Sequence, residues 1–254
     1  MNLLHRTVRK NAAIVVLIKE KLEVYVNVYK VICKYTKTGD LKFISHLDIL
    51  RLMQRAICRA KLPAKYSEGF NPHIKIAFGF PLSLGVESVG EYFELELTEK
   101  VDIEKLVDAL NDVLPNKMKI MGAKYYEGKD SLMTMCNYAE YLINIEASNI
   151  DIENLNALLA KMANEGVTYT KEKKNKAKNK ITKKEINTKD FIHYTKAKII
   201  NDEKVIIEVV FKTSGEGSMK VSDFIKVLEE NNIVIDYYSA MKVESLSEDL
   251  KPIL

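Results

Sequence analysis

Cysteine is scarce in this sequence, and the spacing of the few cysteines excludes the common cysteine-based metal sites. There are three, Cys33, Cys58 and Cys136, and no two of them form the C-x-x-C pair that zinc and iron–sulfur sites use. We therefore predict reduced, partly buried thiols in a cytosolic protein and no metal site.

Long apolar runs are absent as well. No run reaches the roughly 18 apolar residues of a membrane span. The apolar run at residues 12–18 follows Arg6, Arg9 and Lys10, but it is at the short limit for a signal peptide, and no small-residue cleavage site follows it. We predict a cytoplasmic location away from any membrane. Residues 1–23 are an N-terminal extension, either an extra strand or a misassigned start.

The familiar catalytic and cofactor motifs are also missing. The sequence has no P-loop, no G-x-G-x-x-G ahead of a helix, no G-x-S-x-G and no H-E-x-x-H, so we predict no cofactor. With 47% hydrophobic and 29% charged residues among 254, the chain suits two small domains with buried cores. Because the net charge is only +4, a basic binding surface has to come from the distribution of charge.

Hydrophobic periodicity predicts the same order of elements twice. In each half a strand is followed by a helix, two strands, a second helix and a last strand. This order predicts an α+β fold of two tandem ferredoxin-like (βαββαβ) units with antiparallel sheets, at residues 24–127 and 136–254, joined by a linker. The predicted strands are 24–35, 75–78, 91–97, 117–126, 138–146, 197–200, 205–211 and 233–243, and the predicted helices are 46–61 (capped by Ser45 and Asp48), 102–114, 151–164 and 222–230.

Three arginines share one face of the first predicted helix. Arg51, Arg55 and Arg59 stand at i, i+4 and i+8, and Lys65 lies beyond the end of the helix. The chain otherwise prefers lysine, and the planar guanidinium suits phosphate contacts better. We interpret the row as a ridge for nucleic-acid phosphates. The alternative is a solvated face whose last cations favour the helix dipole.

A second basic feature is the lysine-rich segment 171–184, which follows a strand that begins at residues 167–169. Like charges repel and little is available to bury, so we predict a hairpin loop of the second unit that is mobile in solvent. A basic hairpin that grips RNA through Lys174, Lys176 and Lys178 is the functional interpretation.

The stretch after the first helix, residues 66–85, reads YSEGFNPHIKIAFGFPLSLG. Gly69 permits a positive φ, and the Asn71–Pro72 pair favours a turn. Tyr66 and Phe70, flanked by polar turn residues, are candidates for stacking on bases. The remaining aromatic residues of the stretch, Phe78 and Phe80, are predicted to be core.

Two histidines fall near these features. His46 and His73 are of the residue type that performs general acid–base work on an RNA phosphodiester. A metal site would need a third ligand, and only Asp48 or Glu68 is at hand. Structural histidines bonded to the backbone are the plainer interpretation, so no catalytic or metal residue is assigned.

The sequence also contains the blocks GDLKFISHLD (39–48), RA (55–56), RAKLP (59–63), YSEGFNPH (66–73), PLSLG (81–85) and Glu91. Together these motifs resemble the radical SAM-linked protein family over residues 29–250. Its members are uncharacterised bacterial proteins fused to, or encoded beside, a radical SAM protein. Two departures are Glu68, where glutamine is usual, and Asn187, where an acidic residue often ends the block. The C-x-x-x-C-x-x-C motif of a radical SAM cluster is missing, so the resemblance implies an accessory partner.

We predict from this an accessory RNA-binding module, rather than an enzyme, that presents tRNA or rRNA to a partner radical SAM enzyme. The alternatives are a metal-independent endoribonuclease using His46 and His73, or a purely protein-binding adaptor for the radical SAM partner. The predicted RNA-binding residues are Arg51, Arg55, Arg59, Lys65, Tyr66, Phe70, Asn71, His73, Lys174, Lys176 and Lys178.

Overall fold

The computed structural model describes residues 27–254, apart from 148–149, 176–179, 202 and 214–217. The predicted N-terminal extension, residues 1–23, lies outside this part. In chain order the elements are β1 (Tyr29–Lys37), η1 (Gly39–Phe43), α2 (His46–Arg59), β2 (Ile76–Phe78), β3 (Glu87–Leu97), α3 (Ile103–Asn111), β4 (Ile120–Tyr126), α4 (Leu132–Met135), β5 (Tyr138–Glu146), α5 (Ile152–Asn164), β6 (Thr168–Asn175), β7 (Lys180–Asn187), η2 (Thr188–Asp190), β8 (Ile192–Asn201), β9 (Lys204–Lys212), α6 (Val221–Glu230) and β10 (Tyr237–Leu246).

The first half is an antiparallel sheet covered on one face by two helices. β1 lies between β4 and β3, and β2 pairs with the other edge of β3. The apolar side chains of α2 and α3 meet those of β1 and β3 in one core. This core includes Met53 and Ile57 from α2, Leu106 from α3, and Cys33 and Phe93 from the strands.

The second half repeats this strand order. β5 lies between β10 and β9, and β8 pairs with the outer edge of β9, all antiparallel. α5 and α6 pack on one face around Leu159, Phe211 and Phe224. In each half the last strand therefore lies beside the first, with the two helices on a shared face.

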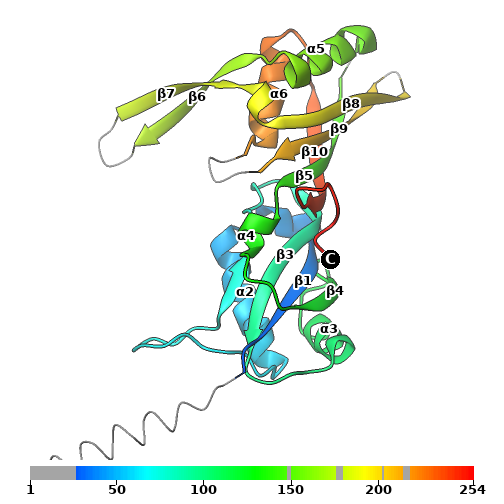
Figure 1. The fold of residues 1–254 in the computed structure, drawn as a ribbon. Helices are drawn as coiled ribbons and strands as arrows, with labels where there is room; N and C mark the ends of the chain where they lie inside the picture. The colour runs from blue at the N-terminus through cyan, green and yellow to red at the C-terminus, as the bar shows by residue number, and fades with distance from the viewer. Residues whose placement is uncertain (1–26, 148–149, 176–179, 202, 214–217) are drawn as a thin grey trace, which may run out of the picture.

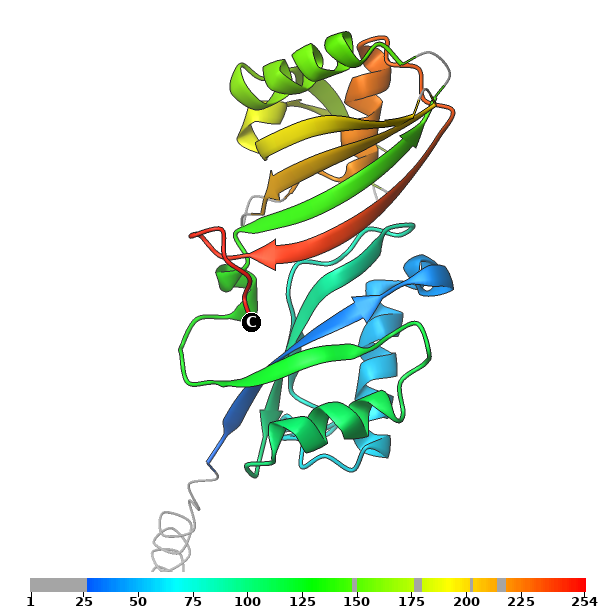
Figure 2. The ribbon, with the colours of Figure 1, turned by 90° about the vertical axis from the view of Figure 1, so that its right-hand side faces the viewer.

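The two halves are stacked end to end and share one sheet (Figures 1 and 2). The link is a short parallel pairing of β10 with β3, Met241 with Glu87 and Lys242 with Ser88. The strands approach closely here, since a Cβ on Gly90 would lie 2.4 Å from the carbonyl oxygen of Val243. The protein is thus a mixed α/β chain with one large, mostly antiparallel sheet.

Local signals in the sequence explain the first helix. The Ser45 side chain caps α2 by accepting from the Asp48 backbone N–H at 3.2 Å, as predicted. The buried face of the helix follows the apolar spacing Ile49, Met53, Ala56 and Ile57. Because these residues fix the rotation of α2 on the sheet, the arginines that alternate with them face solvent.

The lysine-rich segment is not the loop that we predicted. Residues 168–175 and 180–187 form β6 and β7, which pair only with each other in a separate two-stranded sheet. This hairpin is inserted between α5 and β8, and β8 and β9 form the hairpin of the large sheet. The base of β6 is anchored, since Tyr169 is buried in the second core and Lys171 pairs with Asp223 at 2.8 Å. Cross-strand backbone bonds therefore stabilise a segment that charge repulsion alone would leave open.

The predicted linker also contains structure. α4 spans Leu132–Met135, and Leu132 is buried against Ile32 and Tyr92 on the face of the first sheet opposite α2. Ile253 joins the same cluster, so the C-terminal residues return to the first half (Figures 1 and 2). Among the helices that the structure describes, none is long and apolar enough to cross a bilayer.

Candidate nucleic-acid interface

Residues 63–75 form a projecting arm beside α2. At its base, the Lys65 N–H donates to Glu96 of β3 and the Glu96 N–H donates to Lys75, at 2.8 and 3.1 Å. Further out, Tyr66 bridges Ile74, and the Ser67 N–H donates to the His73 carbonyl oxygen at 2.8 Å. The arm is therefore an irregular hairpin held on the edge of β3.

The arm turns back where the sequence indicated a turn. Gly69 has a φ of 114°, which side chains with a Cβ rarely adopt, so glycine permits the reversal. Phe70 at this tip is fully exposed, and Asn71 beside it is exposed too. An aromatic ring that the fold leaves uncovered is available to stack on a ligand. Phe78 and Phe80, beyond the arm, pack against the cores as predicted.

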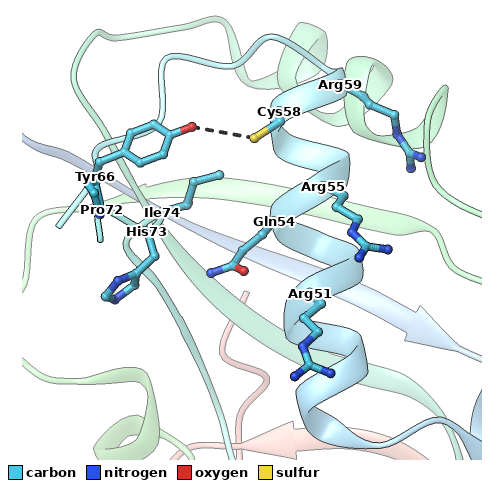
Figure 3. A pocket seen from close by; sticks show the side chains of 9 residues that line it. All are labelled: Arg51, Gln54, Arg55, Cys58, Arg59, Tyr66, Pro72, His73 and Ile74. Atoms are coloured by element: carbon cyan, nitrogen blue, oxygen red, sulfur yellow. Dashed lines mark hydrogen bonds between the residues drawn. The ribbon is translucent and has the colours of Figure 1, made fainter. Parts of the chain in front are cut away.

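A groove of about 540 Å³ separates the arm from α2. Figure 3 shows Gln54 and Cys58 pointing from the helix toward the arm. The Cys58 Sγ lies 3.7 Å from the Tyr66 Oη, and this contact raises the pKa of Tyr66. The groove is lined by Arg51, Gln54, Arg55, Cys58, Arg59, Tyr66, Pro72, His73 and Ile74.

The three arginines form a ridge along α2; in Figure 3 the side chains of Arg55 and Arg59 point away from the arm, and that of Arg51 points along the helix. Arg51 lies 3.4 Å from Asp48, and Arg59 donates to the Val113 carbonyl oxygen at 2.8 Å. Among the described residues Arg55 has no hydrogen-bond or ion-pair partner. A second hollow of about 680 Å³ lies between this arginine ridge and the end of α3, so the ridge separates two depressions.

The two candidate histidines occupy different surroundings. His73 lines the groove, and its Nδ1 lies 2.9 Å from the Ser67 Oγ. His46, in contrast, packs its ring edge-on against Phe78 at 5.3 Å between centroids, and it does not line the groove. The described residues hold no group of three or more histidine, cysteine or acidic side chains placed to bind a metal. An endoribonuclease that uses both His46 and His73 stays a prediction. The structure does not favour it, because only His73 lines the groove.

The sequence of the chain places it in a family. A family model described as "Uncharacterized protein conserved in bacteria (DUF2344)" matches residues 30–221. The chain belongs to the DUF2344 family. Membership of an uncharacterised bacterial family is thus confirmed, and the link to a radical SAM protein remains a prediction. No curated protein matches the DUF2344 chain.

Two solved structures are similar to the DUF2344 chain at low identity. One belongs to a Cbf5–Nop10–Gar1 complex, with 9% identity and a TM-score of 0.48 over 86% of this chain and 50% of that one. This chain thus spans half the length of that relative. The other is an unknown protein from Galdieria sulphuraria, with 11% identity and a TM-score of 0.26 over 85% of this chain and 99% of that one.

The remaining predicted residues of the DUF2344 chain fall outside the groove. Lys65 lies 3.6 Å from Glu96 and is half-buried. Lys176 and Lys178 lie outside the described residues, and Lys174 lies in β6, where only the backbone is described. The β6–β7 hairpin and the arm project from the same side of the molecule in Figure 1. One long ligand on this side of the molecule would therefore be able to contact both the hairpin and the arm.

Sequence reasoning missed two residues of the groove in the DUF2344 chain. Gln54 and Cys58 are spaced i, i+4 on the flank of α2, between its buried face and the arginine ridge. The signal that could have found them is their position on the helix surface, between the face of Arg51 and the buried face of Met53. Which neighbour covers that flank depends on the path of the arm, and periodicity does not give that path.

Proposed function

We propose that this protein is an RNA-binding accessory module whose contact surface is the arginine ridge, the groove and the arm. The observation that carries the proposal is that the arginines of α2 and the residues of the arm line the same groove. Arg55, without a partner among the described residues, and the arm residues Tyr66 and His73 all line the groove. Guanidinium groups bind phosphate, and aromatic side chains stack on bases, so the two halves of a nucleotide have partners here.

The fold supports this proposal because helices and strands hold the groove in place. We propose that each half is a ferredoxin-like unit, because each has the β-α-β-β-α-β order with its last strand beside its first. In the second unit the β6–β7 hairpin is an insertion. Sites built on helices and strands hold their geometry better than sites on loops. Here α2 forms one wall of the groove, and hydrogen bonds to Glu96 of β3 hold the base of the arm that forms the other.

The proposed partner of the module is a radical SAM protein, on the strength of the motif resemblance described above. The chain has three widely spaced cysteines and no cluster motif, so the radical chemistry would belong to the partner. Our proposal is that this chain holds tRNA or rRNA while the partner acts on it.

The test is RNA binding as a function of salt. We expect fluorescein-labelled tRNA to bind the purified chain with an affinity that falls steeply as salt rises. In the variant Arg51→Ala/Arg55→Ala, the slope of log K against log salt should fall by about 2, one unit for each lost phosphate contact. Lys204→Ala, which removes an exposed cation from the second half, is the matched control and should keep the slope. Absent or salt-independent binding would sink the proposal.

A protein adaptor is the second candidate, because one exposed apolar patch lies near the start of α2. Phe43, Leu47 and Leu84 are all exposed, and the Gly85 N–H donates to the Lys42 carbonyl oxygen at 2.9 Å, which brings their two segments together. Clustered apolar side chains on a surface mark contact sites. Capture of the radical SAM partner that survives nuclease and high salt, and fails in Leu47→Ser/Leu84→Ser, would favour this function.

A further inference from the structure

We infer that the groove receives a single unpaired nucleotide, with its base between α2 and the arm and its phosphate on the arginine ridge. This inference rests on the proposed RNA binding and specifies the kind of RNA. Nothing in the sequence motifs distinguishes a duplex from a single strand, whereas the shape and chemistry of the groove do.

The distribution of charge within the site is the first argument. The side chains that point into the groove are uncharged, Gln54 and Cys58, whereas the arginines stand along its rim (Figure 3). A nucleotide has the same division, since the base is neutral and the phosphate carries the charge. Arg55 has no competing partner among the described residues, so a phosphate would not have to displace one.

The groove also offers the contacts that a base requires. Tyr66 is a half-exposed aromatic ring on the wall opposite the helix. The Gln54 amide supplies both donors and an acceptor, which suits the edge of a base. Ile74, buried near the base of the arm, and Pro72 add apolar surface on either side of His73 in the chain. The exposed Phe70 at the tip of the arm is placed to stack on a neighbouring base.

Size and accessibility favour an unpaired base over a paired one. The groove, about 540 Å³, has the volume of a small-molecule site. In A-form RNA the major groove is too deep and narrow for side chains, the wide minor groove shows only base edges, and the face of each paired base stays stacked inside the helix. A base that enters between α2 and the arm must therefore be unstacked and unpaired, as in a loop, a bulge or a single strand.

The inference is tested with three RNAs that share one strand: the single strand, its blunt duplex, and the same duplex with a one-nucleotide bulge. We expect the single strand and the bulged duplex to bind about tenfold more tightly than the blunt duplex, from one base stacked in the groove. A 2-aminopurine at the bulge should change its fluorescence on binding. Equal affinity for blunt and bulged duplexes would overturn the inference and leave the proposed function standing, whereas failure to bind any RNA would overturn both.

Two variants separate the base contact from the phosphate contact. Gln54→Ala should reduce the preference for the bulge to about threefold or less while blunt-duplex binding stays unchanged, because the amide contacts only an inserted base. Asn144→Ala removes an exposed amide from β5 and is the matched control. Arg55→Ala should weaken binding of all three RNAs alike. A bulge preference and a 2-aminopurine signal that survive in Gln54→Ala/Tyr66→Leu, with folding verified by circular dichroism, would place the base elsewhere and overturn the inference.

Discussion

Lys242 donates from its Nζ to the Glu91 Oε1 at 2.7 Å, and this bond joins β10 of the second half to β3 of the first. The two side chains are only 5% and 7% exposed. Burial, the largest single effect, would lower the pKa of Lys242, but the attraction of Glu91 and Tyr141 and the hydrogen bond to Glu91 together outweigh it, so the pKa stands above its ordinary value. Ser88 donates to the same carboxylate oxygen at 3.0 Å. A compensated buried charge pair therefore ties the two halves together.

Glu244 makes a second connection across the junction. Tyr92 donates from its Oη to the Glu244 Oε1 at 2.8 Å, and Lys34 pairs with the other carboxylate oxygen. Ser245 donates from its Oγ to the Gly90 carbonyl oxygen at 3.0 Å. The parallel pairing of β10 with β3 has only two residue pairs. Side-chain polar contacts therefore supply much of the attachment between the halves.

The first prediction concerns the Lys242–Glu91 pair. Lys242→Met should lower the free energy of unfolding by about 3–5 kcal/mol, because Glu91 is left buried without its counter-charge. Lys204→Met is the matched control, since Lys204 pairs with Glu146 at a similar distance, 2.8 Å, on the exposed surface. It should leave the stability almost unchanged. Urea unfolding at pH 7 measures both, and equal effects of the two variants would contradict the role assigned to burial.

The second prediction concerns alkaline pH. Burial, followed by the nearby charge of Glu91, raises the pKa of Tyr35 well above its ordinary value of 10.0. The folded state therefore resists ionisation while the unfolded chain ionises, so this stability is complete below pH 10 and is lost as pH rises above it. Tyr35→Phe should make the alkaline decline shallower by about 1.4 kcal/mol per pH unit.

The measurement for Tyr35 is the unfolding free energy between pH 9 and pH 12, followed by circular dichroism in urea. Tyr194→Phe removes the hydroxyl of an exposed tyrosine and serves as the control, for which we expect the alkaline decline of the unmodified protein. If Tyr35→Phe gave the same slope as the unmodified protein, the buried hydroxyl would not be a source of the decline.

Element order was accessible from the sequence because it depends on local spacing. β5 runs from Tyr138 to Glu146, the predicted bounds, and α2 begins at His46 as its cap indicated. The junction was not accessible, because Lys242 and Glu91 are 151 residues apart in the chain. A pattern of alternating polar and apolar residues predicts that a charged residue in a strand faces solvent. Lys242 and Glu91 are buried only because the two halves are in contact.

Separate parts of the candidate site could be predicted from the sequence, but not how they come together. The arginine ridge and the turn at Gly69 follow from helical spacing and turn chemistry, each a local property. Their meeting around the groove depends on hydrogen bonds between the arm and Glu96 of β3, which no local pattern encodes. The prediction of a loop at the lysine-rich segment was wrong for a related reason, because counting charges took no account of the pairing of β6 with β7.

The third prediction separates binding from stability within the arginine ridge. Arg55→Ala should weaken RNA binding with no change in unfolding midpoint, because Arg55 has no partner among the described residues. Arg59→Ala should weaken binding and also lower the unfolding free energy by about 1 kcal/mol, since Arg59 donates to the Val113 carbonyl oxygen. Anisotropy titrations and urea unfolding on the same samples compare the two. Equal stability losses would show that the hydrogen bond of Arg59 is not what distinguishes them.

The fourth prediction concerns the β6–β7 hairpin, which pairs with no other strand of the described chain. Replacing residues 172–182 by a short Gly-Ser turn keeps Tyr169 in the core and Lys171 on Asp223, so the unfolding midpoint should change little. RNA affinity should fall, because the replaced segment carries five lysines and one glutamate.

A second variant decides whether charge or shape is responsible. It keeps the hairpin length and changes the five lysines of this segment, at 173, 174, 176, 178 and 180, to serine. If the lysines contact phosphates, both variants should lose affinity and reduce the salt slope together. If affinity falls only when the hairpin is removed, its backbone or its fold is what RNA requires. If neither variant changes binding, the RNA surface is confined to the arginine ridge, the groove and the arm.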